Sequence, residues 1–144
     1  ADVWTISAYQ RAIMADPQNP LYRVNLGGIY YSLKNYDEAN RYFEQAIELK
    51  PSWPNSYYNL AWSSFQQDDV NKAVNAMENV VKLLDPSKDK VDYDKANADL
   101  EEFKKKLKTL EEAEKASKSA TDNSQLNLPQ AQDNQIDPKL DIQN

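Results

Sequence analysis

Apolar residues follow one another at intervals of three and four positions through most of this chain, the spacing of one face of an α-helix. The pattern is interrupted where turns are favoured, at Lys34-Asn35, Pro51, Asp68-Asp69 and Asp85-Pro86. The sequence therefore predicts an all-α fold. We expect a helix within residues 1–17, helical hairpins over residues 19–50 and 54–84, and a long helix over residues 89–118.

The first hairpin carries capping residues at its expected boundaries. Asn19 precedes Pro20, and a proline is favoured in the first turn of a helix because its missing N–H is not needed there. Asn35 is followed three residues later by Glu38, a spacing that predicts a capping pair for the second helix. That helix is expected to end before Pro51, because a residue before proline is biased away from the helical conformation.

The two hairpins are related by a sequence period of 34 residues. The matching pairs are Pro20 and Pro54, Asn25 and Asn59, Leu26 and Leu60, Ala39 and Ala73, Glu44 and Glu78, and Leu49 and Leu83. Such a period is typical of helix-turn-helix solenoids, in which each unit buries its apolar face against its neighbours. We expect a half unit at 1–17, full units at 19–52 and 53–88, and a capping helix at 89–118. A half unit at the start suggests a piece cut from within a longer array or just after another domain.

The long helix places apolar side chains on one face, with Glu–Lys pairs at the i,i+4 spacing that supports a helix. These apolar positions are Tyr93, Ala96, Leu100, Phe103, Leu107 and Leu110. The pattern predicts a terminal helix that docks on the last unit, although the same seam could join two chains as a short coiled coil. Residues 119–144 are rich in Asn, Gln, Asp and Ser. We expect them to be a disordered tail, because they bury too little apolar surface to offset their ordering entropy.

The amino-acid composition excludes several kinds of catalytic and metal-binding site. The 144 residues include no Cys and no His and carry a net charge of −6. Thiol nucleophiles, disulfides, imidazole bases and Cys/His metal sites are therefore excluded, and we expect no cofactor. The acidic balance argues against nucleic-acid binding. No apolar run is long enough to cross a bilayer, so we expect no membrane insertion by this segment. A chain without Cys fits oxidising and reducing compartments equally.

The remaining candidates for catalysis have simpler structural interpretations. Asp68-Asp69 lies in a predicted turn, and Asp92 and Asp94 lie at a predicted helix start, both places where acids are favoured. The basic run at 104–106 is nearly neutralised by neighbouring glutamates, which is typical of a solvated helix face. We therefore expect a protein that is not an enzyme.

The repeated units closely resemble the tetratricopeptide repeat family over residues 4–88. The first full unit has the family's residues Leu26-Gly27, Tyr30, Ala39, Phe43, Ala46 and Pro51. The second has Leu60-Ala61, Ala73, Met77 and Val80, but Ser64 replaces the family's Tyr and Asp85 replaces its Pro. Lys34 and Asp68 stand where the turn glycine is usual. The resemblance implies a right-handed superhelix over residues 1–118.

The resemblance also implies a function and a site. Proteins of this family are scaffolds that bind a peptide or protein segment in a concave groove lined by the first helix of each unit. Carried over to this chain, the partner-binding residues are Asn25, Gly28, Tyr31, Asn55, Tyr58, Asn59, Trp62 and Gln66, with Val24 and Phe65 also facing the groove. An Asn amide can both donate to and accept from a peptide backbone. The alternative is that these Asn and aromatic residues only pack within the repeats, with Phe65 replacing the missing Tyr.

Two narrower resemblances lead to different expectations. Co-chaperones of this family clamp a C-terminal carboxylate with Lys, Arg and Asn, but Val24 and Gly28 replace the first Lys and an Asn here, so we do not expect that activity. The Trp53-Pro54 pair, the Leu-Leu-Asp-Pro turn, the Lys-rich helix and the tail resemble the C-terminal regions of bacterial O-antigen polymerases and ligases. That likeness implies a soluble regulatory or assembly appendage of a membrane protein. We expect a monomer, with dimerisation through the long helix as the alternative.

Overall fold

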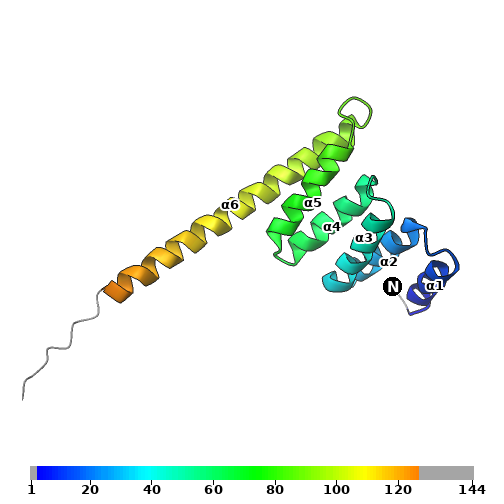
Figure 1. Ribbon diagram of the computed structural model, residues 1–144, viewed down its shortest axis with the longest axis horizontal. Coiled ribbons are helices and arrows are strands. Elements are labelled where there is room, and N and C mark those ends of the chain that lie inside the picture. The colour runs from blue at the N-terminus through cyan, green and yellow to red at the C-terminus, as the bar shows by residue number, and fades with distance from the viewer. Residues whose placement is uncertain (1–2, 127–144) are drawn as a thin grey trace, which may run out of the picture. The chain divides into compact units, whose positions relative to one another are not determined.

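The computed structural model describes residues 3–126, and side chains up to residue 123. Six α-helices follow one another in these residues, with no strand among them (Figure 1). Their bounds are α1 Val3–Ala15, α2 Pro20–Ser32, α3 Tyr36–Leu49, α4 Pro54–Gln66, α5 Val70–Leu83 and α6 Lys90–Leu126. No helix in the described part of the chain is both apolar enough and long enough to cross a membrane. The all-α prediction is confirmed.

The chain divides into two compact parts, residues 1–110 and residues 111–144. The first part contains α1 to α5, with both repeat units, and the beginning of α6. In the second part, the described residues 111–126 are a continuous helical segment of α6. This helix runs eight residues past the predicted end at residue 118, so the prediction of disorder is wrong for Ser119–Leu126. The helical backbone there also accepts a side-chain hydrogen bond, from the Thr121 hydroxyl to the Ser117 carbonyl at 3.0 Å. The rest of the predicted disordered tail lies outside the described residues.

The helix starts follow the capping residues. Asn19 Oδ1 accepts a hydrogen bond from Leu21 N–H at 3.1 Å, and Asn35 Oδ1 accepts one from Glu38 N–H at 3.3 Å. The Glu38 carboxylate does not complete a reciprocal capping pair. It pairs instead with Arg41, whose Nε donates to it at 3.2 Å. Asp69 Oδ1 caps α5 by accepting from Lys72 N–H at 3.1 Å.

Both hairpin turns use a non-glycine residue in the left-handed conformation. Lys34 has φ 58° and Asp68 has φ 61°. After α2, Asn35 N–H donates to Tyr30 O at 2.9 Å and Lys34 N–H to Tyr31 O at 2.9 Å. Equivalent bonds end α4, from Asp69 to Ser64 at 3.0 Å and from Asp68 to Phe65 at 3.1 Å. This is the Schellman arrangement, which satisfies the last carbonyls of each helix.

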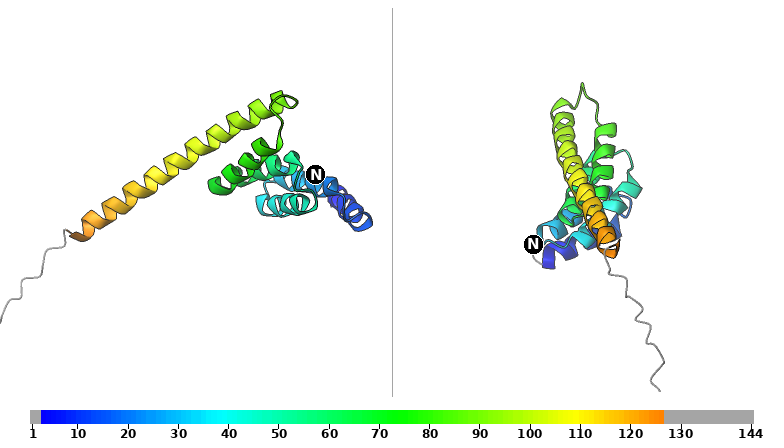
Figure 2. Two further views of the ribbon diagram at one scale, coloured as in Figure 1. Left: turned by 45° about the horizontal axis from the view of Figure 1, so that its top comes forward. Right: turned by 90° about the vertical axis from the view of Figure 1, so that its left-hand side faces the viewer.

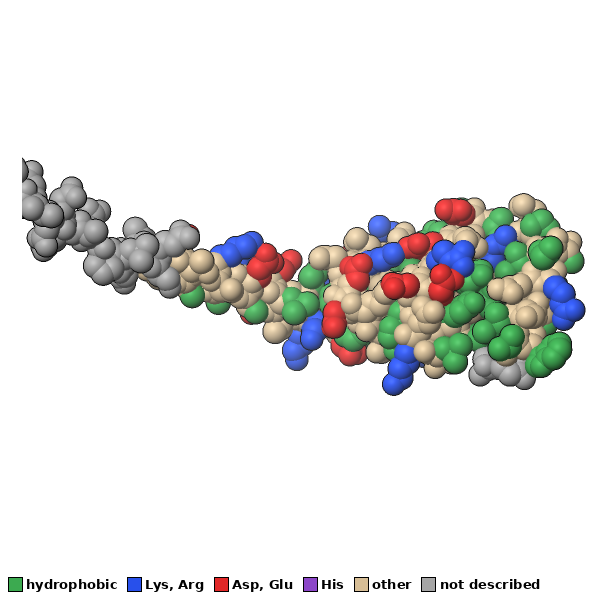
Figure 3. All heavy atoms as spheres, turned by 90° about the horizontal axis from the view of Figure 1, so that it is seen from below, with side chains coloured by type: hydrophobic (Ala, Val, Ile, Leu, Met, Phe, Trp, Pro, Cys, Tyr) green, Lys and Arg blue, Asp and Glu red, His purple; other side chains and the backbone are tan. Residues whose placement is uncertain are grey.

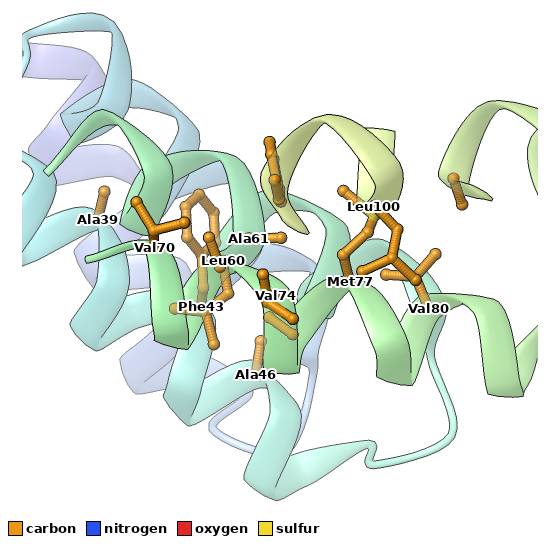
Figure 4. Packing of buried hydrophobic residues seen from close by; sticks show 14 of the residues in the cluster. Ala39, Phe43, Ala46, Leu60, Ala61, Val70, Val74, Met77, Val80 and Leu100 are labelled. Carbon is orange, nitrogen blue, oxygen red and sulfur yellow. The ribbon is translucent and has the colours of Figure 1, made fainter. Parts of the chain in front are cut away.

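The core runs through the two hairpins and into the first part of α6. α2 packs on α3, α3 on α4, and α4 on α5, as the separate views in Figure 1 and Figure 2 agree. Phe43 of α3 lies among Ala39, Leu60 and Val70 in the close-up of Figure 4. The small residues Ala39, Ala46, Ala61 and Ala73 are fully buried, so the helices approach closely at these points.

The second unit fills its hairpin differently from the first. In the first unit, Tyr30 of α2 stacks on Tyr42 of α3, with ring centroids 5.6 Å apart. Ser64 and Ala76 occupy the positions 34 residues later, and both are buried. Phe65 does not replace the missing Tyr. It stacks instead on Phe103 of α6, with ring centroids 4.4 Å apart.

The first part of α6 docks on the second unit. Ala96, Leu100 and Phe103 are at most 6% exposed, and Figure 4 shows Leu100 beside Met77 and Val80 of α5. Leu107 is partly buried against the same core, whereas Leu110 is 42% exposed. Most of the apolar seam predicted for the long helix is therefore used for docking within the chain.

α1 packs on α2 without burying any of its residues completely. Val3, Trp4 and Met14 are the most exposed apolar residues of the helix, each more than three-quarters exposed. This is the behaviour expected of a half unit, because one face of the helix contacts the next unit while the other has no helix against it among the described residues.

Candidate functional site

Five of the eight predicted partner-binding residues surround one hollow. The hollow lies between α2 and α4, has a volume of about 220 Å³, and is called the Gly28 hollow below. It is lined by Gly28, Tyr31, Phe43, Tyr58, Asn59 and Trp62. Gly28 opens this space, because a Cβ built there would meet no atom within 4 Å. The first helices of the two full units therefore share an aromatic surface with a recess in it.

A second hollow adjoins the first. It has a volume of about 350 Å³ and is called the Trp53 hollow below. It is lined by Trp53, Pro54, Asn55, Tyr58, Asn59, Val80, Leu84, Asp92 and Lys95. Tyr58 and Asn59 line both hollows, so these two side chains separate them. The structure thus brings six of the eight predicted residues to one continuous surface, spread over α4 with α2 on one side and α6 on the other.

Asn59 lies between the hollows with its amide group already oriented. Its Nδ2 donates to the Asn55 backbone carbonyl at 2.9 Å and to Asn55 Oδ1 at 2.5 Å, both within α4. The amide oxygen of Asn59 accepts no hydrogen bond from the described part of the chain. This orientation leaves an acceptor at the boundary between the two hollows.

Tyr58 and Lys95 join α6 to this surface. The Tyr58 hydroxyl donates to Asp99 Oδ2 at 3.0 Å, and the Lys95 ammonium lies 5.4 Å from the centroid of the Tyr58 ring. Hydrogen bonding to Tyr58 raises the pKa of Lys95, and the Asp99 and Asp92 carboxylates act in the same direction. The Lys95 ammonium therefore lies beside the Tyr58 ring and its carboxylate partner.

Tyr31 stands on the opposite side of the Gly28 hollow. Its ring contacts Tyr36 edge to face, with centroids 5.5 Å apart. Burial is the main cause that raises the pKa of Tyr31, and Tyr36 and Tyr58 add to it. The nearby Gln66 side chain acts in the opposite direction on the pKa of Tyr31. Gln66 lines neither hollow.

Three sequence expectations need correction or refinement. Val24, expected to face the groove, is 8% exposed and belongs to the core. Trp62 lines the Gly28 hollow but also contacts Phe103 edge to face, with centroids 5.0 Å apart, so it has a structural role as well. Asn25 is half-buried and lines neither hollow.

The residues that sequence reasoning missed come from outside the first helices. Trp53 lies in the turn before α4, Leu84 follows α5, and Asp92 and Lys95 lie at the start of α6. The 34-residue period could not place the last two, because the register changes after the second unit. The sequence did offer one signal. Asp92 and Asp94 lie at the predicted start of the long helix, but they were interpreted only as acids favoured at a helix N-terminus.

The surface offers groups suited to recognising another chain. No cluster of three or more acidic side chains suited to a metal ion is found among the described residues. Figure 3 shows acidic and basic side chains interspersed on the face it presents, instead of gathered by sign. Aromatic rings around two recesses can hold another chain by apolar contact, and the amide side chains can hydrogen-bond to it.

The fold and this surface define a class: a solenoid of helical hairpins with its candidate site on the first helices. The tetratricopeptide repeat family matches residues 20–53 and, through a second sequence profile, residues 55–84. The chain belongs to the tetratricopeptide repeat family, as the residues of its two full units predicted.

Relatives and solved structures agree with this assignment. The small glutamine-rich tetratricopeptide repeat-containing protein 2 of Saccharomyces cerevisiae is 32% identical over 113 residues, which cover 74% of this chain. The chain spans about a third of that relative, 32% of its length. None of these matches supports the resemblance to bacterial O-antigen polymerases and ligases.

Two solved structures have the same fold. The second tetratricopeptide repeat domain of human RPAP3, solved with the HSP70 peptide SGPTIEEVD, is 27% identical with a TM-score of 0.59, covering 69% of this chain and 78% of that one. The first tetratricopeptide repeat domain of Spaghetti (RPAP3), bound to the HSP90 peptide SRMEEVD, is 24% identical with a TM-score of 0.62, covering 71% of this chain and 76% of that one.

Proposed function

We propose that this chain is a non-catalytic scaffold that binds a segment of a partner protein on the surface formed by α2 and α4. The observation that carries the proposal is the Gly28 hollow, which gathers Gly28, Tyr31, Tyr58, Asn59 and Trp62. Aromatic side chains around a recess supply the contact area that dominates protein–protein affinity. The family assignment favours the same function, since both RPAP3 domains described above hold a peptide.

The oligomerisation alternative has less support from the contacts. A coiled coil through α6 needs an unused apolar seam, but Ala96, Leu100 and Phe103 are buried within the chain. Leu107 and Leu110 alone make up less than one heptad. For the appendage of a membrane glycan polymerase, no residue of the described part supplies a specific argument.

The test is a crosslinking capture from the native lysate with two variants. Gly28→Leu fills the Gly28 hollow from a position where added atoms meet no neighbour, and Asn59→Ala removes the amide between the hollows. Trp62→Ala is a poor choice, because it would also disturb Phe103 and α6. We expect the double variant Gly28→Leu/Asn59→Ala to keep its helicity and lose the captured partner.

The matched control changes the other side of the repeats. Glu48→Ala and Asn75→Ala alter exposed residues of α3 and α5 around a separate hollow of about 400 Å³. We expect this control to capture the same partner as the native chain. If the control loses the partner and the α2–α4 variant retains it, binding occurs on the α3–α5 side and the proposal is wrong.

A further inference from the structure

The two adjoining hollows differ in chemistry, and this difference bears on what the surface binds. The Gly28 hollow is lined by uncharged side chains. The Trp53 hollow has an apolar wall of Trp53, Val80 and Leu84, while Asp92 and Lys95 stand at α6. An occupant that fills both must therefore present two different side chains.

The charges around the Trp53 hollow are not equivalent. Lys95 lies over the Tyr58 ring, whose hydroxyl donates to Asp99, and the Asp99 and Asp92 carboxylates both act on its charge. Asp92 is exposed and forms no salt bridge with a described residue. A long basic side chain suits this arrangement, because its methylene stem can lie on the apolar wall while its charged end reaches a carboxylate.

The position of Asn59 favours an extended occupant. Its amide oxygen is available between the hollows, and its amide nitrogen is held by Asn55. An acceptor there can bond to a peptide N–H only if that N–H is not already used inside a helix. In an extended chain, side chains two residues apart point to the same side at a separation of about 7 Å. Two side chains with this spacing can enter the Gly28 hollow and the Trp53 hollow on either side of Tyr58 and Asn59.

We propose that the surface binds an internal, extended segment of a partner protein that carries an apolar residue and, two positions away, an arginine or lysine. The apolar side chain enters the Gly28 hollow and the basic side chain enters the Trp53 hollow towards Asp92. This inference rests on the proposed function and adds a specificity to it. It also disfavours acidic C-terminal peptides, since Lys95 is the one cation among the described residues that line the two hollows, and its ammonium lies over the Tyr58 ring.

The experiment selects peptides from a random display library on the full chain and, in parallel, on Gly28→Leu. Sequences enriched on the native chain are then made as free peptides and their affinities measured by fluorescence anisotropy. We expect the enriched set to share the apolar–x–basic spacing. The acidic peptide SRMEEVD should bind at least about tenfold more weakly than the best of them.

Two isosteric variants distinguish a specific effect of the Asp92 carboxylate from the general attraction of a basic peptide to an acidic protein. Asp92→Asn removes the charge at the Trp53 hollow, and Asp94→Asn removes the same charge two residues away, where Asp94 pairs with Lys90 at 2.8 Å. We expect Asp92→Asn to weaken the basic peptides about threefold or more and Asp94→Asn to leave them unchanged. Equal weakening by both would overturn the role of the Trp53 hollow.

The remaining outcomes are equally decisive. Enriched peptides that lose binding on Gly28→Leu but lack the spaced basic residue would leave the scaffold function standing and overturn this specificity. No enrichment on the native chain over Gly28→Leu would overturn both. A synthetic peptide of residues 127–144 is included. If it bound more tightly than any library peptide, the occupant would be the chain's own C-terminal segment, and the partner assigned above would be wrong.

Discussion

Gly27 and Phe43 fit together so closely that a Cβ at Gly27 would lie 2.6 Å from Cε1 and 2.8 Å from Cδ1 of the Phe43 ring. Ala61 and Met77 occupy the same two positions 34 residues later, and both are fully buried. The repeat therefore tolerates a methyl group on the first helix where the second helix supplies a flexible thioether, and excludes it where a rigid ring fills the space.

Two adjacent glycines should consequently respond in opposite ways. Gly27→Ala is expected to lower the free energy of unfolding by about 1–3 kcal/mol, because Phe43 is buried and has little room to shift. Gly28→Ala meets no atom within 4 Å and should raise it by about 0.5–1 kcal/mol through helix propensity. Urea unfolding followed by circular dichroism measures both.

The second repeat supplies the control for that pair. The double variant Gly27→Ala/Phe43→Met copies the Ala61 and Met77 combination into the first repeat. If close approach is the cause, Phe43→Met should cost less stability in the Gly27→Ala background than in the native chain. Equal costs in the two backgrounds would show that the clash is not what constrains Gly27.

The turn residue Lys34 should be replaceable with a gain in stability. Its φ of 58° lies in the left-handed region, which costs a residue with a Cβ about 1–2 kcal/mol. Glycine removes that cost but has more freedom in the unfolded chain, so Lys34→Gly should stabilise by roughly 0.5–1 kcal/mol net. Asp68→Gly should gain less, since aspartate tolerates this conformation better. Thermal unfolding of the two variants tests the order.

Docking of α6 should depend on one ring. Phe103 is fully buried and contacts both Phe65 and Trp62, so Phe103→Ala should destabilise the chain by about 3–5 kcal/mol. Because Trp62 then becomes more exposed to water, its fluorescence emission should move to longer wavelength. Leu110→Ala, at a position 42% exposed on the same helix, is the control and should change neither readout appreciably. A similar response from both variants would argue against docking through Phe103.

Alkaline pH should destabilise the fold in part through Tyr31. Burial raises the pKa of this hydroxyl above its unfolded value of about 10. The folded state therefore holds the proton more tightly, and its contribution to stability is present below about pH 10 and lost as the pH rises through the folded pKa. Tyr31→Phe should lose less stability than the native chain between about pH 9 and pH 11. Identical losses in urea titrations would mean that ionisation of Tyr31 does not oppose folding.

The repeat period explains why most of the fold could be predicted. Asn19, Asn35 and Asp69 cap helices through contacts only two or three residues away, so local sequence is sufficient to place these boundaries. The period also carried Gly28, Tyr31, Tyr58, Asn59 and Trp62 to one surface. These are local or repeated relationships, and both can be recognised in a single chain.

Non-local packing set the limit of prediction. Phe65 was ambiguous because its partner, Phe103, lies 38 residues further along the chain in a helix outside the repeat. Val24 was placed at the groove by carrying over the family's groove positions, but in this chain the side chain is buried in the core. Lys95 and Asp92 depend on how the turn at Asp85 sets the rotation of α6, where Asp85 Oδ1 accepts from Ser87 N–H at 2.8 Å.

The start of α6 both closes the solenoid and forms one wall of the Trp53 hollow. In an array of hairpins, an amino-acid substitution at a groove position must still allow its repeat to stack on the neighbouring repeats. Exposed positions at the start of α6, such as Asp92 and Lys95, do not carry that packing requirement. Under the proposed specificity, we expect that exchanging the opening turns of this one helix, while keeping Ala96, Leu100 and Phe103, changes which peptides bind and leaves both repeats folded. We therefore expect sequence variation between related chains to concentrate in these opening turns of α6.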